Sequence, residues 1–238
     1  MNLLLLGESA GSARYLLGTF ARAGISVRHV EARERLDHTD ESFDVALFSD
    51  YPAANLGPDA AASIVRSVQA GAGLIMIGGW ASFTGRGNGY RQTPIEAVLP
   101  VTCAETDDRR NVWGGLWLEA VAPEHPIFRG LDVQSPPVIC GYNIVTPKPE
   151  ATLLAYGRRV AFDRGTPRAG ESVPLLVAGA AGRGRTIAYA SDLVPHWCGG
   201  IVDWGSERVT LPTGAEVGVG YCTFLTNMLR WVSGSNEA

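Results

Sequence analysis

Two apolar segments separated by an amphipathic one constrain the fold of this chain more than any other feature. Residues 43–50 read FDVALFSD, and residues 74–77 form a second apolar run that ends in a Gly-Gly turn. Between them, residues 59–70 carry apolar side chains at helical spacing. A strand-helix-strand order is typical of parallel α/β sheets, whose ligand sites lie at the carboxyl ends of the strands. Those ends are Ser49-Asp50 and Gly78-Gly79-Trp80.

The remaining elements alternate as a doubly wound sheet requires. Further strands are predicted over residues 3–6, 25–30 and 186–190, the last paired as an antiparallel hairpin with residues 173–177. Further helices are predicted over 13–23, which Gly24 ends, over 94–99, and over 221–232. Residues 100–168 are rich in Pro and Gly, with short strand-like pieces at 138–140 and 152–156, and are interpreted as a β-rich elaboration on one sheet edge. We expect the 238 residues to form a single domain.

Composition narrows the class of protein. The chain is 46% apolar and 18% charged, which favours a globular protein with a buried sheet. Its net charge of -4 argues against a nucleic-acid partner. No apolar run is long enough to span a membrane, and Gly7-Glu8-Ser9 interrupts the opening apolar run too early for a secretory signal. The four cysteines form no CxxC pair, so a reduced, cytoplasmic protein is expected.

Several loops after predicted strands carry polar or glycine residues that are candidates for a site. The turn at residues 7–12 leads into a helix; a cap by Ser9 or Ser12 is favoured there over an anion site, and Glu8 is expected to point toward the crevice. Gly78 and Gly79 allow a sharp turn and offer N–H donors. The loop at 85–93, which includes Tyr90, is glycine-rich and equally consistent with a surface loop. Residues 106–110 favour an exposed, self-neutralising charge run over a carboxylate pair.

One histidine stands out from the four. His196 follows a predicted central strand, with Asp192 four residues before it and Trp197 directly after it. His29 lies within a predicted strand, His38 in a charged loop, and His125 in a His-Pro turn. A site role for His196 and a structural, hydrogen-bonded role are equally favoured by this pattern.

Several segments together resemble a known family. They are FDVALFSD, the stretch GLIMIGGWASFTGRGNGYRQTPIEAVLPV followed by DDR, HPIFRGL, and SDLVPHW before the last predicted helix. This combination resembles the glutamine amidotransferase-like family of the class I glutamine amidotransferase superfamily, a neighbour of the trehalose-utilisation proteins. The resemblance covers residue 43 to the C-terminus, and it implies a flavodoxin-like three-layer α/β/α sandwich.

The resemblance also implies where catalytic groups would lie. True class I amidotransferases place a cysteine nucleophile at the sharp turn that corresponds to Ile77-Gly78-Gly79-Trp80, and glycine stands there in this sequence. His196 lies near the expected histidine, but Cys198 occupies the place of the glutamate. Ser82, expected in a first helical turn, is the nearest alternative nucleophile, and Cys103 is expected to be a small core residue. Without a thiolate no covalent acyl intermediate forms there, so no glutaminase activity is expected.

Three hypotheses about function remain. The first is a small-molecule binding domain for a sugar or amide, with no cofactor and no metal; its expected pocket residues are Glu8, Asp50, Gly78, Gly79, Trp80, Ser82, Tyr90, His196 and Trp197. The second is a hydrolase or lyase in which His196 is the general base, oriented by Asp192 or Asp50, with the Gly78 and Gly79 amides as oxyanion donors. A metal variant with Asp50, Asp192 and His196 has no supporting ligand motif. The third is a scaffold or homo-oligomer that buries the tryptophans at 113–117 and 197–204.

Overall fold

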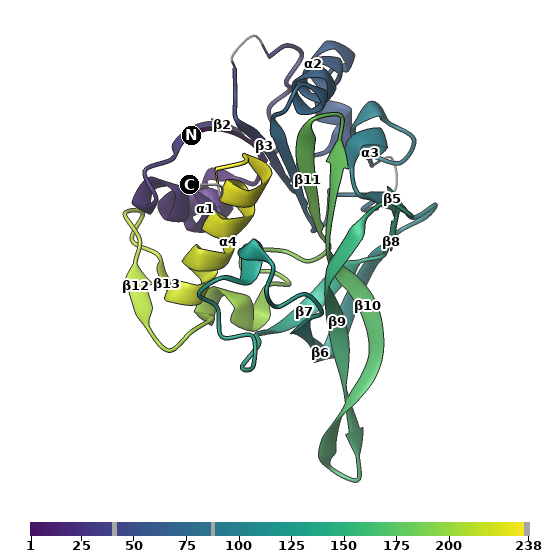
Figure 1. Cartoon of the computed structure of the whole chain (residues 1–238), viewed down its shortest axis with the longest axis vertical. Helices are drawn as coiled ribbons and strands as arrows, with labels where there is room; N and C mark the ends of the chain where they lie inside the picture. Colours follow the sequence, from purple (N-terminus) through teal and green to yellow (C-terminus); the bar gives the residue numbers. More distant parts are fainter. Residues whose placement is uncertain (40–41, 87–88, 236–238) are drawn as a thin grey trace.

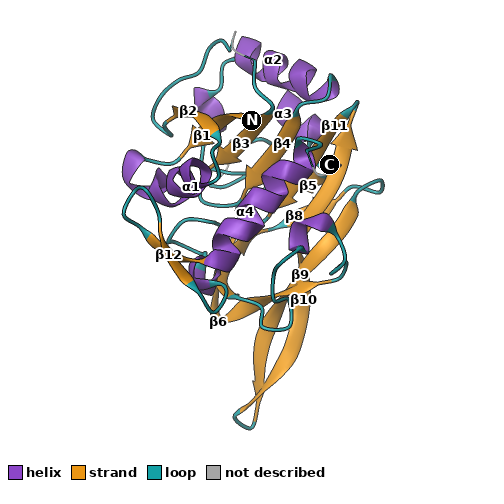
Figure 2. Cartoon of the chain, turned by 60° about the vertical axis from the view of Figure 1, so that its left-hand side comes forward, coloured by secondary structure: helices purple, strands orange, loops and turns teal. Residues whose placement is uncertain are grey.

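The chain folds around one nine-stranded mixed sheet with helices on both faces, as the computed structural model in Figures 1 and 2 shows. The structure describes residues 1–39, 42–86 and 89–235. The strand order is β2-β1-β3-β4-β11-β10-β9-β6-β7. The first five strands are parallel, and the last four join them antiparallel. The parallel half has the order of a flavodoxin-like sheet, with β11 as its fifth strand.

The bounds of the elements follow the chain. The sheet strands are β1 (Asn2–Gly7), β2 (Ser26–Val30), β3 (Val45–Ser49), β4 (Gly73–Ile77), β6 (Arg109–Ala120), β7 (Val138–Asn143), β9 (Thr152–Asp163), β10 (Thr166–Ala181) and β11 (Gly184–Tyr189). The helices are α1 (Ala10–Arg22), α2 (Pro58–Gln69), α3 (Pro94–Val98) and α4 (Val219–Val232), with single 3-10 turns at Ala53–Asn55, Pro126–Phe128 and Gly199–Asp203. Two small antiparallel sheets pair β5 (Val101–Cys103) with β8 (Val145–Pro147) and β12 (Arg208–Thr210) with β13 (Glu216–Gly218).

Alternating side chains of the parallel strands divide the core into two layers. Leu3 and Leu5 of β1 pack with Phe20 of α1 and Phe224 of α4 on one face. Leu4 and Leu6 of the same strand pack with the residues of α2 and α3 on the other face. Figure 2 shows α4 lying across the sheet. Since both faces are covered, the parallel strands are apolar throughout, which explains why they were recognisable in the sequence.

The predicted elements are largely confirmed, and the short strands β5, β8, β12 and β13 are additional to them. Three further differences concern α1, the turn after β4 and β6. Helix α1 begins at Ala10, three residues before the predicted start, because the Ser9 hydroxyl caps it by accepting the Ser12 N–H at 3.3 Å. The turn directly after β4 does not begin a helix: Ser82 lies in a bend rather than a helical turn. The long strand β6 was not predicted, although the tryptophans at 113 and 117 belong to it.

The segment at residues 100–168 is β-rich and lies at one edge of the parallel half, as predicted, where its strands extend the sheet. Strands β9, β6 and β7 continue the sheet beyond β10. The ends of β9 and β10 project from the body as a two-stranded ribbon, seen at the bottom of Figure 1. Among the described residues, no helix is long and apolar enough to cross a membrane.

Candidate functional site

The crevice at the carboxyl ends of the parallel strands begins with two carboxylates on strained backbone. Glu8 follows β1 with φ 55°, and Asp50 follows β3 with φ 52°, both in the left-handed region that non-glycine residues seldom occupy. Glu8 is 5% exposed, and its Oε1 accepts the Ser49 hydroxyl at 2.8 Å. The two neighbouring strands therefore bring both carboxylates to the same part of the crevice.

The Asp50 side chain reaches across to the turn that follows β4. Its Oδ1 accepts the Ala81 N–H at 2.8 Å, and its own N–H donates to the Ser82 hydroxyl at 3.1 Å. A Cβ atom on Gly79 would lie only 2.5 Å from Asp50 Cγ and 2.7 Å from Asp50 Oδ2. The carboxylate of Asp50 thus takes the space that a side chain at the turn would need.

The two glycine amides of this turn are already hydrogen-bonded within the protein. Gly78 N–H donates to the Tyr189 carbonyl at 2.7 Å, and Gly79 N–H donates to Asn143 Oδ1 at 2.8 Å. In this conformation neither amide is available to an oxyanion, which removes the role that the sequence had suggested for them. The amide that does face a carboxylate is that of Ala81.

The buried side chains of Asn143 and Asp108 hydrogen-bond to the turn that follows β4. Asn143, at the end of β7, also donates its Nδ2 to the Gly79 carbonyl at 3.0 Å and to Asp108 Oδ1 at 2.8 Å. Asp108 Oδ2 accepts the Thr84 N–H at 2.9 Å. Both side chains are 0% exposed, so the prediction of an exposed charge run was wrong for Asp108. Asp107 and Arg109 do form an exposed ion pair at 2.6 Å.

The imidazole of His196 stacks on the indole of Trp80, the residue that follows Gly79 in this turn. The ring centroids are 5.3 Å apart with an interplanar angle of 9°. The guanidinium groups of Arg86 and Arg109 lie over the same indole at 5.0 and 4.8 Å. Trp197 is buried, and its Nε1 donates to Asn111 Oδ1 at 2.8 Å. The segment after β11 is therefore anchored to β6, and it holds the imidazole over Trp80.

Two cavities meet at His196 and differ in character. A cavity of about 340 Å³ is lined by two carboxylates, by residues of α1 and by the segment after β11. Its residues are Glu8, Gly11, Ser12, Arg14, Tyr15, Asp50, Val194, Pro195 and His196. An aromatic cavity of about 300 Å³ is lined by Trp80, Asn111, Val112, Trp113, Cys140, His196 and Trp197. We name them the acidic cavity and the aromatic cavity.

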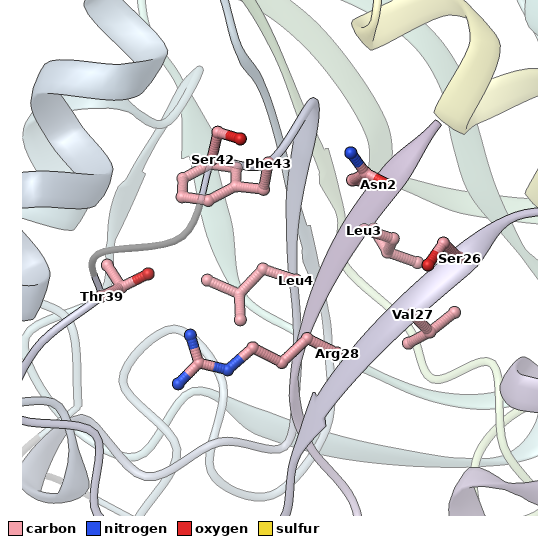
Figure 3. Close-up of a pocket in the computed structure, with 9 residues that line it drawn as sticks. All are labelled: Asn2, Leu3, Leu4, Ser26, Val27, Arg28, Thr39, Ser42 and Phe43. Carbon is pink, nitrogen blue, oxygen red and sulfur yellow. The ribbon is translucent and has the colours of Figure 1, made fainter.

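Larger hollows lie away from this crevice. One of about 520 Å³ covers the start of β1 and β2, and Figure 3 shows Leu4, Arg28 and Phe43 among the side chains around it. Another, of about 550 Å³, lies near Asp203, Trp204 and the start of α4. Volume alone does not mark a site, and neither hollow joins strand-end carboxylates with an imidazole, so the crevice is the better candidate.

The crevice carboxylates hold protons more tightly than free ones. Burial and the nearby Asp50 charge raise the pKa of Glu8 to about 7. Burial raises the pKa of Asp50, although backbone N–H groups and the His196 charge oppose the rise. Burial, with the charges of Glu8 and Asp50, raises the pKa of Asp192 well above its usual value. Three neighbouring acids with raised pKa values are typical of functional sites.

The raised pKa of Glu8 makes stability depend on pH. Because the folded chain holds this proton up to about pH 7 and the unfolded chain releases it near pH 4.5, stability falls as pH rises between these values. We expect Glu8→Gln to remove about 3 kcal/mol of that decline. Urea unfolding at about pH 5 and about pH 8 measures it, with the exposed Glu150→Gln as control. An unchanged decline in Glu8→Gln would contradict the assignment.

The remaining predicted residues fall outside the two cavities. Tyr90 is 1% exposed against Phe48, and its hydroxyl donates to the Tyr51 carbonyl at 2.7 Å. Ser82 is 1% exposed and engaged with Asp50. Residues 87 and 88 of the predicted glycine-rich loop lie outside the described residues.

Sequence reasoning missed Asn143 and did not foresee that Asp108 is buried. Asn143 belongs to none of the segments singled out above, and Asp108, although part of the DDR segment, carries no signal that it is buried. Their importance comes only from the hydrogen bonds that the fold brings together.

The cysteines do not supply the missing thiol at the turn. Cys103, as predicted, is buried in the core, and burial raises its pKa. Cys198, at the expected glutamate position, is buried, which raises its pKa to about 12. Cys140 is exposed at the edge of the aromatic cavity. Among the described residues, no group of three or more His, Cys, Asp or Glu side chains is arranged to hold a metal ion.

Comparison with known protein families identifies the family of this chain. Residues 42–212, most of the chain, match the family described as "Putative glutamine amidotransferase". The chain belongs to this family. No curated protein matches it. The crevice described above lies at the carboxyl ends of the parallel strands, where open α/β sheets bind their ligands.

Solved structures show the same fold. Two proteins of Salmonella typhimurium called cytoplasmic proteins are similar over nearly their whole length. STM3548 is 26% identical with a TM-score of 0.78, and covers 98% of this chain and 99% of its own. STM1381 is 27% identical with a TM-score of 0.75 and the same coverage. A β-galactosidase from Rahnella is 15% identical with a TM-score of 0.57, over 97% of this chain and 31% of its own, and shows the fold alone.

Proposed function

We propose that this glutamine amidotransferase-like domain binds a small polar ligand, a sugar or an amide, in the strand-end crevice and does not hydrolyse glutamine. The observation that carries the proposal is the place of Asp50. Its carboxylate fills the turn after β4, where a family nucleophile would need room, and it accepts the Ala81 N–H there. In this proposal the domain retains the strand-end crevice of the fold, and the group at its turn is the Asp50 carboxylate instead of a cysteine thiolate.

The two cavities suit such a ligand. Carboxylates accept hydrogen bonds from hydroxyl and amide donors, and the exposed ring of Trp113 in the aromatic cavity offers apolar surface to a sugar ring. Trp113 is fully exposed, which is unusual for so large an apolar side chain unless a partner covers it. His196 lines both cavities, so one ligand of modest size can contact both.

A thermal-shift and calorimetric screen tests the proposal. We expect one class among glutamine and other amides, monosaccharides and disaccharides to raise the melting temperature, with no ammonia released from glutamine. Trp113→Ala is expected to weaken binding about tenfold, because it removes the exposed stacking face, while Phe162→Ala on the projecting ribbon leaves binding unchanged. A flat screen, or ammonia release, would refute the proposal.

A second candidate is a hydrolase or lyase with His196 as general base. Asp50 and His196 line the same cavity and interact electrostatically, which favours it, since a nearby carboxylate stabilises a protonated imidazole. Asp192 and Ser82 are too buried to touch a ligand directly and would act through their neighbours. In this case His196→Ala keeps ligand affinity and loses turnover, whereas loss of both would place His196 in binding alone.

We also propose a cellular location and an association state for the protein. The two Salmonella relatives called cytoplasmic proteins support a cytoplasmic location. The fully exposed Trp113 supports a homo-oligomer or scaffold as a further alternative, which concentration-dependent sedimentation tests. The negative net charge supports the absence of a nucleic-acid partner.

A further inference from the structure

The acidic cavity contains carboxylates that the fold does not neutralise. Glu8 and Asp50 line it, and their hydrogen bonds come from uncharged donors, the Ser49 hydroxyl and the Ala81 N–H. Among the described residues, no Lys, Arg or His nitrogen lies within 4.0 Å of either carboxylate. Arg14 is at the exposed rim, where its guanidinium lies over the Tyr15 ring at 4.9 Å.

A second observation comes from Asp192, which is 1% exposed after β11. Its Oδ1 accepts the Val194 N–H at 3.0 Å, while its buried Oδ2 has no hydrogen-bond partner in the described part of the chain. Glu8 and Asp50 are the charges that act on it most strongly. A buried acceptor without a donor is rare in folded proteins, and both of the carboxylates that act on this one line the acidic cavity.

We infer that the ligand of this crevice carries a protonated amino group, held between Glu8 and Asp50. The inference rests on the proposed function and narrows it to amino sugars and other small hydroxylated amines. An ammonium group offers three N–H donors and a positive charge, and it needs no fixed coordination geometry. The absence of a metal-holding arrangement among the described residues favours an organic cation over a metal ion.

The charges around the cavity support this assignment. Glu8, Asp50, Arg14 and His196 line the cavity, and the buried Asp192 interacts electrostatically with Glu8 and Asp50. Because burial and mutual repulsion hold a proton on Glu8 near neutral pH, a bound ammonium replaces that proton's stabilising effect. Binding of an amine therefore releases a proton from Glu8 to the solvent, and binding of a neutral ligand does not.

Matched pairs of ligands test the inference. Calorimetry at about pH 7 compares glucosamine with glucose, galactosamine with galactose, and ethanolamine with ethylene glycol. We expect the amine of at least one pair to bind at least about tenfold more tightly than its neutral partner. For ethanolamine, whose own amine stays protonated, titration in buffers of different ionisation enthalpy is expected to show about half a proton released per ligand.

Variants test whether the Glu8 and Asp50 carboxylates, and not a general change in the protein, cause the proton release and the preference for amines. Glu8→Gln is expected to abolish proton release, and Asp50→Asn to remove the preference for the amine, while Glu150→Gln keeps both. Circular dichroism and melting temperature establish that each variant is folded. If a variant does not fold, proton release by the wild-type protein still decides the question.

Each outcome is decisive. If neutral ligands bind as tightly as their amines, the inference is wrong and the proposed function stands. If no amine of the three pairs binds, the inference is overturned, and the wider ligand screen then decides the proposed function separately. If amines bind tightly but Glu8→Gln and Asp50→Asn leave the preference unchanged, the ammonium lies elsewhere and the inference fails.

Discussion

Replacing Gly79 with alanine is expected to lower the free energy of unfolding by about 4 kcal/mol. Gly79 has φ 157°, and a Cβ atom there would lie 2.5 Å from Asp50 Cγ, so the Asp50 carboxylate and the backbone both have to move. Urea unfolding measures the loss. Gly71→Ala is the matched control, because Gly71 also has positive φ, 123°, but its added Cβ would meet nothing nearer than 4.0 Å. We expect about 1 to 2 kcal/mol for that control.

A double-mutant cycle identifies the cause of the Gly79 effect. Asp50→Gly removes the carboxylate from the turn and suits its positive φ, so the two substitutions together are expected to be less destabilising than their sum. Additive effects would mean that the clash is not the cause. Gly79→Cys, which supplies a thiol at the turn where the resemblance places the nucleophile, is expected to show no glutaminase activity because Asp50 occupies its space.

Asn143→Ala is expected to cost about 4 kcal/mol of stability. The substitution leaves three buried groups without their partner: the Gly79 N–H, the Gly79 carbonyl and the Asp108 carboxylate. Each unsatisfied buried group costs about 1 to 3 kcal/mol, and charged groups cost more. The measurement is equilibrium unfolding in urea.

Asn227→Ala provides the comparison for Asn143. Its amide donates to the Ile127 and Arg129 carbonyls at 3.1 and 2.8 Å, but from a partly exposed position where water can replace it. We expect a loss of about 1 kcal/mol there. Similar losses in both variants would show that the buried network does not support the turn.

The parallel half of the fold was predictable because its strands are buried on both faces. GLIMI and VALFS are apolar without interruption, and glycine or a capping serine marks the ends of the neighbouring helices. Strand β6 was not predictable, since Gly114 and Gly115 fall at an irregularity in its pairing with β7 and break the alternation of side chains.

The position of the candidate site at the strand ends was predictable from the sequence, but the hydrogen bonds of its residues were not. Glu8, Asp50 and His196 follow strands, and topology alone brings strand ends together. The hydrogen bonds of Gly78 and Gly79 depend on Tyr189 and Asn143, which lie far away along the chain. The sequence showed that the glycines could donate, but it gave no means to see that their donors were already used.

The position of β11 in the middle of the sheet has a consequence for how the chain assembles. Leu74 of β4 pairs with Thr186 of β11, so the second neighbour of β4 is synthesised only after every strand from β5 to β10, while β3 already pairs with the other edge. Until then, the edge of β4 has unpaired backbone groups beside a wholly apolar sequence, a combination that favours mispairing between chains. Such distant pairing also slows folding, because the loop must close before its contacts form. The nascent chain is therefore most prone to aggregate while its antiparallel half is still being made.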